Sequence, residues 1–150
     1  MKIAGAAPDE ALRERALAPD ASFLVQAPAG AGKTELLIQR YLRLLSLVDE
    51  PEEILAITFT RKAAAEMQRR ICQALVGEPR AGSADSVSGR RQQLLVAAVR
   101  SRDRARGWGL ADYPSRLRIS TIDSLNASLA RSTPVSGGAN VLRPLATQFE

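Results

Sequence analysis

The stretch QAPAGAGKTELLIQRYL, from Gln26 to Leu42, decides how the rest of this chain is interpreted. It places small residues ahead of a Lys-Thr pair, and apolar residues at helical spacing follow. A loop of small residues lets several backbone N–H groups turn inward, and a helix beginning at Lys33 adds the positive end of its dipole. The stretch therefore predicts an anion-binding loop at the start of a helix.

The loop departs at one position from the usual phosphate-loop pattern of Gly, four residues and Gly-Lys-Ser/Thr, because Ala27 replaces the first Gly. Gly30 and Gly32 allow close approach of the backbone to phosphate. Lys33 supplies a charge for the β- and γ-phosphates and Thr34 a hydroxyl for Mg²⁺, and we expect the Lys33 ammonium to have no partner in an empty loop. With ATP and Mg²⁺ as cofactors, the predicted binding residues are Ala27, Ala29, Gly30, Ala31, Gly32, Lys33, Thr34 and Glu35.

The composition fits one basic, globular domain. The 150 residues carry a formal net charge of +5, and Arg provides 18 of the 21 basic side chains, so nucleic acid is the favoured partner. The one cysteine, Cys72, excludes an intramolecular disulfide, and the absence of His excludes a Cys/His zinc site. No segment has the roughly 20 apolar residues of a membrane span. We expect a cytoplasmic protein with no membrane partner.

Hydrophobic periodicity predicts alternating strands and helices. Predicted strands cover residues 22–26, 54–59 and 117–121, and predicted helices cover residues 8–17, 33–47, 61–75, 90–106 and 123–131. The run 54–59 is typical of a parallel strand buried on both faces. Residues 77–89, rich in Gly, Ser and Pro, are predicted to be a mobile loop. This order predicts an α/β fold with helices on both faces of a parallel sheet.

Apolar residues at three- and four-residue spacing should face the core. They are Leu37, Tyr41, Leu44 or Leu45 and Val48 in helix 33–47, Ala64, Met67, Ile71 and Leu75 in helix 61–75, and Leu94, Leu95, Ala98 and Val99 in helix 90–106. Thr60 is expected to cap helix 61–75, and Trp108 and Tyr113 to be packing anchors. The arginines of helix 90–106 form either a nucleic-acid surface or a solvated face with Asp103 as partner.

Two further stretches resemble helicase motifs. ILAITFTRKAAAEMQRRI, from Ile54 to Ile71, resembles motif Ia of superfamily-1 helicases of the UvrD/RecB type, whose usual form is TFTNKAAAEM followed by basic residues. LRISTIDSLNASLAR, from Leu117 to Arg131, is similar to the next motif of that family, usually T-[FI]-H-[ST]-F. With the phosphate loop, these stretches make residues 9–131 similar to the N-terminal part of a RecB- or AddA-like helicase subunit.

The resemblance implies a three-layer, RecA-like P-loop NTPase domain with a parallel sheet. Residues 1–131 would be its N-terminal part, and residues 132–150 an irregular tail or the start of a missing segment. The implied function is that of an ATP-dependent translocase or helicase on single-stranded DNA, in recombination or repair, with nuclease or other helicase-complex subunits as partners. Because the family's Walker B acids and arginine fingers lie further along its sequence, we expect a fragment that binds ATP but hardly hydrolyses it alone.

On the same resemblance, the DNA groove is expected to be lined by Thr58, Phe59, Thr60, Arg61, Thr121 and Ser124. Hydroxyls and Arg61 suit backbone phosphates, and Phe59 offers a stacking face that tolerates any base. The alternatives are that Phe59 is a core aromatic at a strand end and that Arg61 and Lys62 are a solvated helix start.

Some residues depart from the family's pattern. Asp123 replaces the usual His and would repel phosphate unless it caps the helix that begins there. Glu35 stands where many relatives have an Arg near the nucleotide base, and Asp9 and Arg13 are found where the adenine-reading Gln is expected.

Two other functions share parts of the pattern: a small P-loop kinase, against which motif Ia argues, and a non-catalytic nucleic-acid-binding module. A response of ATP binding or turnover to single-stranded DNA separates the latter from a helicase.

Overall fold

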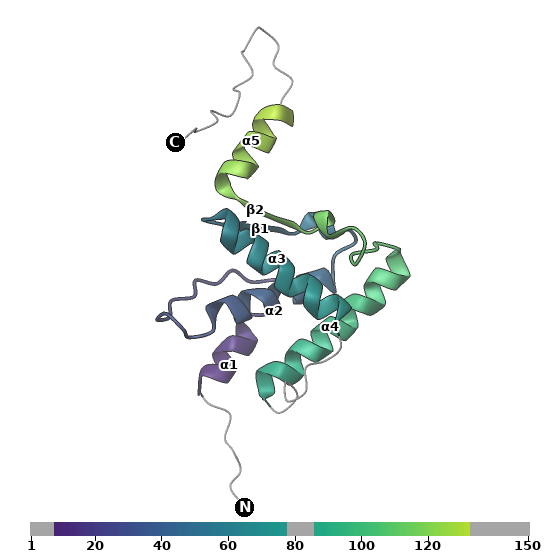
Figure 1. Cartoon of the computed structure of the whole chain (residues 1–150). Coiled ribbons are helices and arrows are strands. Elements are labelled where there is room, and N and C mark those ends of the chain that lie inside the picture. The colour runs from purple at the N-terminus through teal and green to yellow at the C-terminus, as the bar shows by residue number, and fades with distance from the viewer. Residues whose placement is uncertain (1–7, 78–85, 133–150) are drawn as a thin grey trace, which may run out of the picture.

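In a computed structural model, which describes residues 8–77 and 86–132, helices pack on one face of a two-stranded sheet (Figure 1). The helices are α1 (Pro8–Arg15), α2 (Lys33–Leu45), α3 (Arg61–Val76), α4 (Val87–Arg106) and α5 (Ile122–Ser132), and the strands are β1 (Leu55–Thr58) and β2 (Arg118–Thr121). The fold is therefore mixed α/β. Among the described residues, no helix combines the length and the apolar character needed to cross a bilayer.

The two strands are parallel, in a register that pairs Leu55 with Arg118 and Thr58 with Thr121. Parallel neighbours need a long crossover, and α3 and α4 lie in this one. The carboxyl ends of both strands consequently meet at one edge of the sheet, where α3 and α5 begin. The predicted parallel sheet is confirmed for these two strands.

Arg116 links the turns that precede the two strands. Its guanidinium donates to Glu52 Oε1 at 2.6 Å and to Glu50 Oε2 at 2.8 Å. The hydrogen bond from Arg116 holds the pKa of the Glu52 carboxyl below its ordinary value. The pairing fixes where β1 and β2 enter the sheet.

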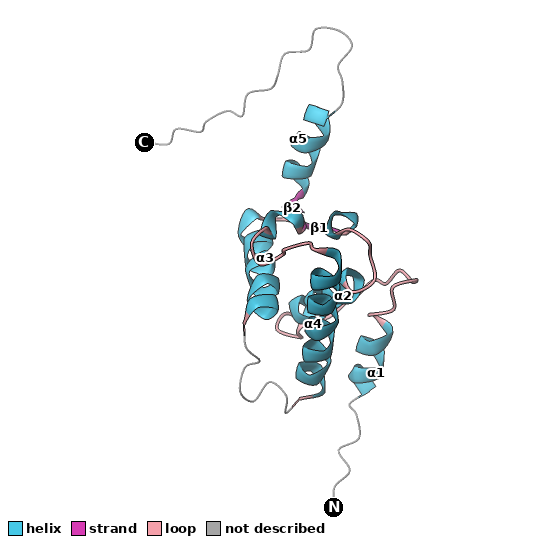
Figure 2. Cartoon of the chain, turned by 90° about the vertical axis from the view of Figure 1, so that its right-hand side faces the viewer, coloured by secondary structure: helices cyan, strands magenta, loops and turns pink. Residues whose placement is uncertain are grey.

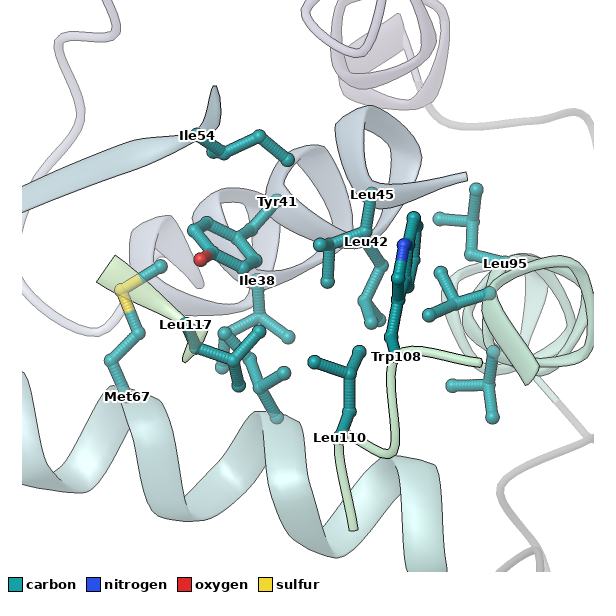
Figure 3. Close-up of a cluster of buried hydrophobic side chains, with 13 residues drawn as sticks. Ile38, Tyr41, Leu42, Leu45, Ile54, Met67, Leu95, Trp108, Leu110 and Leu117 are labelled. Atoms are coloured by element: carbon teal, nitrogen blue, oxygen red, sulfur yellow. The ribbon is translucent and has the colours of Figure 1, made fainter. Parts of the chain in front are cut away.

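The hydrophobic core lies where α2, α3 and α4 meet (Figure 3). Leu42 and Leu45 of α2 are fully buried, and Trp108 is 2% exposed. The Trp108 indole N–H donates to the Asp49 carbonyl at 3.1 Å, so the buried ring has its polar atom satisfied. Trp108 is thus the packing anchor that the sequence predicted, whereas the same prediction for Tyr113 is wrong, because its side chain is 63% exposed.

The prediction of a strand over residues 22–26 is wrong, because this segment has no regular secondary structure. A strand needs a hydrogen-bonded neighbour, and β1 and β2 pair with each other while residues 22–26 lie outside their ladder. The apolar side chains that suggested a strand are exposed, Leu24 almost completely.

Within residues 8–77 and 86–132, β1 is buried on one face only, contrary to the expectation of burial on both. Ala56 packs toward the core, but Leu55 and Ile57 point to the other face and are 40% and 49% exposed. In residues 8–77 and 86–132, helices cover one face of the sheet, so the three-layer arrangement remains an expectation.

Some apolar stripes are displaced from their predicted positions. Leu37, Leu94 and Ala98 are exposed, and the buried residues are Leu36, Ile38, Tyr41, Leu42 and Leu45 in α2 and Leu95, Val96 and Val99 in α4. Both helices carry adjacent apolar residues, so several stripes fit the sequence equally well. The stripe of α3 is confirmed for Ala64, Met67 and Ile71, which are buried, while Leu75 is partly buried against the same core.

Helix α4 begins at Val87, three residues before its predicted start, because Ser86 Oγ accepts a hydrogen bond from the Gly89 N–H at 2.9 Å. Residues 78–85 of the predicted mobile loop lie outside the described residues.

Several arginines of α4 bind backbone carbonyls of its neighbours. Arg100 Nε donates to the Leu75 carbonyl at 2.7 Å, and Arg102 Nε donates to the Val48 carbonyl at 2.8 Å. These carbonyls lie at or just beyond the ends of α3 and α2, where helical acceptors lack intrahelical partners. Asp103 accepts from the Gly109 N–H at 2.7 Å, in the turn after α4. Part of the predicted basic face is therefore used for packing.

Tyr41 offers a test of this core. Its hydroxyl is buried without a hydrogen-bond partner among the described residues, and burial raises the pKa of the phenol above its ordinary range. Because an unsatisfied buried hydroxyl costs about 1–3 kcal/mol, Tyr41→Phe should leave the free energy of unfolding unchanged or raise it by about 1 kcal/mol. Urea denaturation measures this, with exposed Tyr113→Phe as control. A clear loss of stability in Tyr41→Phe alone would show that the hydroxyl has a partner.

Candidate nucleotide and nucleic-acid sites

The loop between residues 26 and 34 depends on two glycines. Gly30 has φ of +80° and Gly32 has φ of +76°, the left-handed region that costs other residues about 1–2 kcal/mol. Gly32 is also the residue that precedes the first turn of α2. A Cβ built on Gly30 would meet no atom within 4 Å, so the loop is open on that side. The predicted glycines thus stand where the backbone requires them.

Lys33 is bound within its own loop, contrary to the expectation that its ammonium would have no partner. Its Nζ donates to the Ala27 carbonyl and, at 2.8 Å, to the Pro28 carbonyl. A flexible ammonium with three donors finds these carbonyls easily. Both residues are at least partly exposed, so water can replace Lys33 there if the ammonium turns toward an anion. Thr34 follows in the first turn of α2 and is exposed.

Helix α1 lies against the loop through Arg13. Its Nη2 donates to the Ala31 carbonyl at 2.6 Å, while its Nε donates to Asp9 Oδ2 at 2.7 Å. A cavity of about 300 Å³ is lined by α1, residues 23–27 and the start of α2, with Arg13 and Lys33 on its wall. Sequence reasoning noted Asp9 and Arg13 only as replacements for a Gln; the structure brings Arg13 to the loop.

Two further arginines hold α1 in place. Arg91 of α4 pairs with Glu10 and, at 2.7 Å, with Glu14. Arg40 of α2 donates to the Ala18 carbonyl at 3.0 Å, just after α1. The loop between residues 26 and 34 is therefore flanked by a helix that is tied to both α2 and α4.

Glu35, the third residue of α2, contacts two other elements. Its Oε2 lies 3.4 Å from Arg70 Nη2 of α3, and its Oε1 accepts from Gln39 Nε2 at 3.3 Å. Gln39 is 2% exposed and also donates to Ser88 Oγ of α4 at 2.7 Å. Sequence reasoning missed this network, because 35 residues separate Glu35 from Arg70 and no local pattern links them.

The second candidate site is the sheet edge where β1 and β2 end. The register places Thr58 beside Thr121, so the structure brings the two predicted DNA-contacting segments together. Phe59 is 98% exposed, which excludes the alternative of a core aromatic. Arg61 and Lys62 are exposed in the first turn of α3. This edge presents an aromatic ring beside cationic side chains.

The hydroxyls at this edge hold the two strand–helix turns. Thr60 Oγ1 accepts from the Ala63 N–H at 3.1 Å, which confirms the predicted cap of α3, and Thr58 Oγ1 donates to the Thr60 carbonyl at 3.0 Å. Thr121 is buried, and its Oγ1 accepts from the Ser124 N–H at 3.2 Å. Thr121, rather than Asp123, supplies this bond at the start of α5.

The residues gathered at the loop fit a nucleotide and its metal in kind. Backbone N–H groups at the start of α2, the Lys33 ammonium and the Thr34 hydroxyl are the donors and the ligand that a Mg²⁺-bound polyphosphate requires. In the part of the chain that the structure describes, no three acidic or Cys side chains gather as a metal site. A magnesium ion here would rest on Thr34 and on the nucleotide's own oxygens.

Comparison with known proteins gives a family and several relatives. A family model described as the UvrD/REP helicase N-terminal domain matches residues 9–143. DNA helicase II of Escherichia coli is 38% identical over 109 residues, which are 71% of this chain and 15% of that protein. An ATP-dependent helicase/nuclease subunit of Moorella thermoacetica is 43% identical over 79 residues, 51% of this chain and 6% of that protein. The comparison with solved structures gave no match.

Thr60 should contribute to stability through its cap. Thr60→Ala removes the acceptor of the Ala63 N–H and should lower the free energy of unfolding by about 1 kcal/mol, whereas Thr60→Ser should retain it. Chemical denaturation of the two variants measures the difference. Equal stability of Thr60→Ala and the unmodified chain would show that the hydrogen bond from the Ala63 N–H to Thr60 does not stabilise this turn.

Proposed function

The chain belongs to the UvrD/REP helicase N-terminal domain family, and from this premise we propose that it forms the ATP-binding part of a DNA translocase or helicase that works in recombination or repair. The observation that carries the proposal is the loop with left-handed Gly30 and Gly32, followed by Lys33 and Thr34 at the start of α2. Family membership also argues against the kinase alternative.

In the proposed nucleotide site, the chain's own groups bind and orient a triphosphate. Lys33 leaves the Ala27 and Pro28 carbonyls and reaches the β- and γ-phosphates, while the N–H groups at the start of α2 face the same anion. Thr34 contributes its hydroxyl to Mg²⁺. When bound, Mg·ATP would supply the free energy of phosphoanhydride hydrolysis. Ala27, Ala29 and Ala31 complete the proposed binding residues, and Glu35 adjoins them in the first turn of α2 with its carboxylate turned to Arg70 and Gln39.

The proposed DNA contact is the sheet edge at the ends of β1 and β2. Arg61 would bind backbone phosphate, and the exposed Phe59 ring would stack on a base without reading its identity. Thr58, Thr60 and Ser124 would offer further hydroxyl contacts, while Thr121, which is buried, would act chiefly by holding its turn. The partner is therefore single-stranded DNA of any sequence.

The chain spans 15% or less of the length of the relatives reported above. We accordingly propose that translocation requires a second RecA-like domain, and that a further helix layer covers Leu55 and Ile57 of β1 in the RecA-like arrangement. Some relatives are subunits of a helicase/nuclease, so a nuclease or another helicase-complex subunit is the proposed partner, in the cytoplasm.

The nucleotide site is tested by Lys33→Ala. The isolated chain should bind Mg·ADP weakly, and the variant should lose at least tenfold in affinity, because the phosphates then lack their cation. Isothermal titration calorimetry measures the affinity, and thermal unfolding checks the fold, since the substitution also releases the Ala27 and Pro28 carbonyls. Equal binding by a folded Lys33→Ala variant would remove the phosphate-loop assignment.

The DNA site is tested with Arg61→Ala and Phe59→Ala. Arg61→Ala should weaken binding to unrelated oligonucleotides equally and reduce its salt dependence, because one phosphate contact is lost. Phe59→Ala should cost about 1–3 kcal/mol with little change in salt dependence, because stacking is not ionic. Fluorescence anisotropy at two salt concentrations measures both. Arg69→Ala, which removes a cation paired with Glu66 elsewhere on α3, is the control. A strong preference for one sequence contradicts the proposal.

A further inference from the structure

Glu35 places a negative charge where the proposed ligand is also negative. It directly follows Thr34, in the first turn of α2, whose N–H groups face the loop. A carboxylate at this position suits the helix dipole but repels a polyphosphate that binds at the same helix end. If the loop binds nucleotide, another group must therefore offset the negative charge of the Glu35 carboxylate.

Arg70 of α3 is positioned to do so. Its Nη2 lies 3.4 Å from Glu35 Oε2. Gln39 Nε2 donates a hydrogen bond to the other carboxylate oxygen of Glu35, Oε1, at 3.3 Å. Gln39 is itself fixed, because its buried amide donates to Ser88 of α4. Oε2 of Glu35 is thus directed toward α3, and Oε1 toward Gln39, a residue of α2 that also contacts α4.

We propose that Arg70 is a positioning residue for nucleotide binding: it neutralises Glu35 and holds its carboxylate away from the phosphates. This inference rests on the proposed nucleotide site and adds to it a residue from a different helix. It also gives α3, which begins at the proposed DNA-binding edge, a charged contact with the first turn of the nucleotide-binding helix.

The effect of losing Arg70 on the affinity for nucleotide should be modest. The side chains of Glu35 and Arg70 are 30% and 39% exposed, so water and salt screen their charges. Loss of Arg70 should therefore weaken Mg·ADP binding by about three- to tenfold at low salt and by less at high salt. A direct structural collapse of the loop would show no such salt dependence.

The experiment is a double-mutant cycle by calorimetric titration of Mg·ADP at two salt concentrations. Arg70→Ala should lower the affinity, Glu35→Gln should leave it unchanged or raise it, and the double variant should bind as Glu35→Gln does. Arg70→Lys, which keeps the charge, should retain most of the affinity. Arg69→Ala on the same helix changes the net charge equally but removes a partner of Glu66, and should bind as the unmodified chain does.

The outcomes distinguish a failure of the inference alone from a failure of the proposed function. If the unmodified chain binds Mg·ADP and loses it in Lys33→Ala, but Arg70→Ala binds normally, the inference alone fails. If the double variant stays as weak as Arg70→Ala, Arg70 does not act through Glu35, and the inference also fails. If the unmodified chain does not bind Mg·ADP, both fail. Should Arg70→Ala not fold, Arg70→Gln takes its place in the cycle.

Discussion

The burial of one side of α2 is the constraint on which the rest of the structure depends. Leu42 and Leu45 are fully enclosed by α3, α4 and the turn that carries Trp108, so the position of α2 is fixed near its carboxyl end. Its other end is the loop that carries Lys33 and Thr34, and a helix transmits position along its length because its backbone hydrogen bonds are continuous. Packing far from the loop therefore determines where Lys33 and Thr34, the residues proposed to bind nucleotide, are placed.

Arginine is used here as much for architecture as for recognition. Arg100 and Arg102 bind carbonyls at or beyond the ends of α3 and α2, Arg91 ties α1 to α4, and Arg116 joins the turns before both strands. A planar guanidinium can serve several acceptors at once, which suits the bare carbonyls at helix ends. A high net charge thus gives little information about where nucleic acid binds, and the small group around Arg61 is the more specific indication.

The sequence predicts local elements well and tertiary relationships less well. Every predicted helix is present, because periodicity and caps such as Thr60 and Ser86 act within a few residues. The strand over residues 22–26 is absent from the described structure, because apolar character supplies no ladder partner. The two glycines of the loop were recognisable in the sequence, and their positive φ values explain why glycine stands at positions 30 and 32. The sequence did not predict the contacts of Arg13 and Glu35, because they arise only when α1 packs against the loop and α3 packs against α2.

Helix α5 leaves β2 and extends away from the other helices (Figures 1 and 2), and none of its side chains is buried. An 11-residue helix without buried apolar contacts is marginally stable in water. Its amide protons should exchange with solvent through local opening, at a free-energy cost far below that of α2, while the buried Thr121 hydroxyl keeps its first turn attached. The sheet edge where β1 and β2 end therefore joins a rigid side, at α3, to a more mobile side, at α5, and the α5 side can adjust to the path of a ligand that lies across this edge.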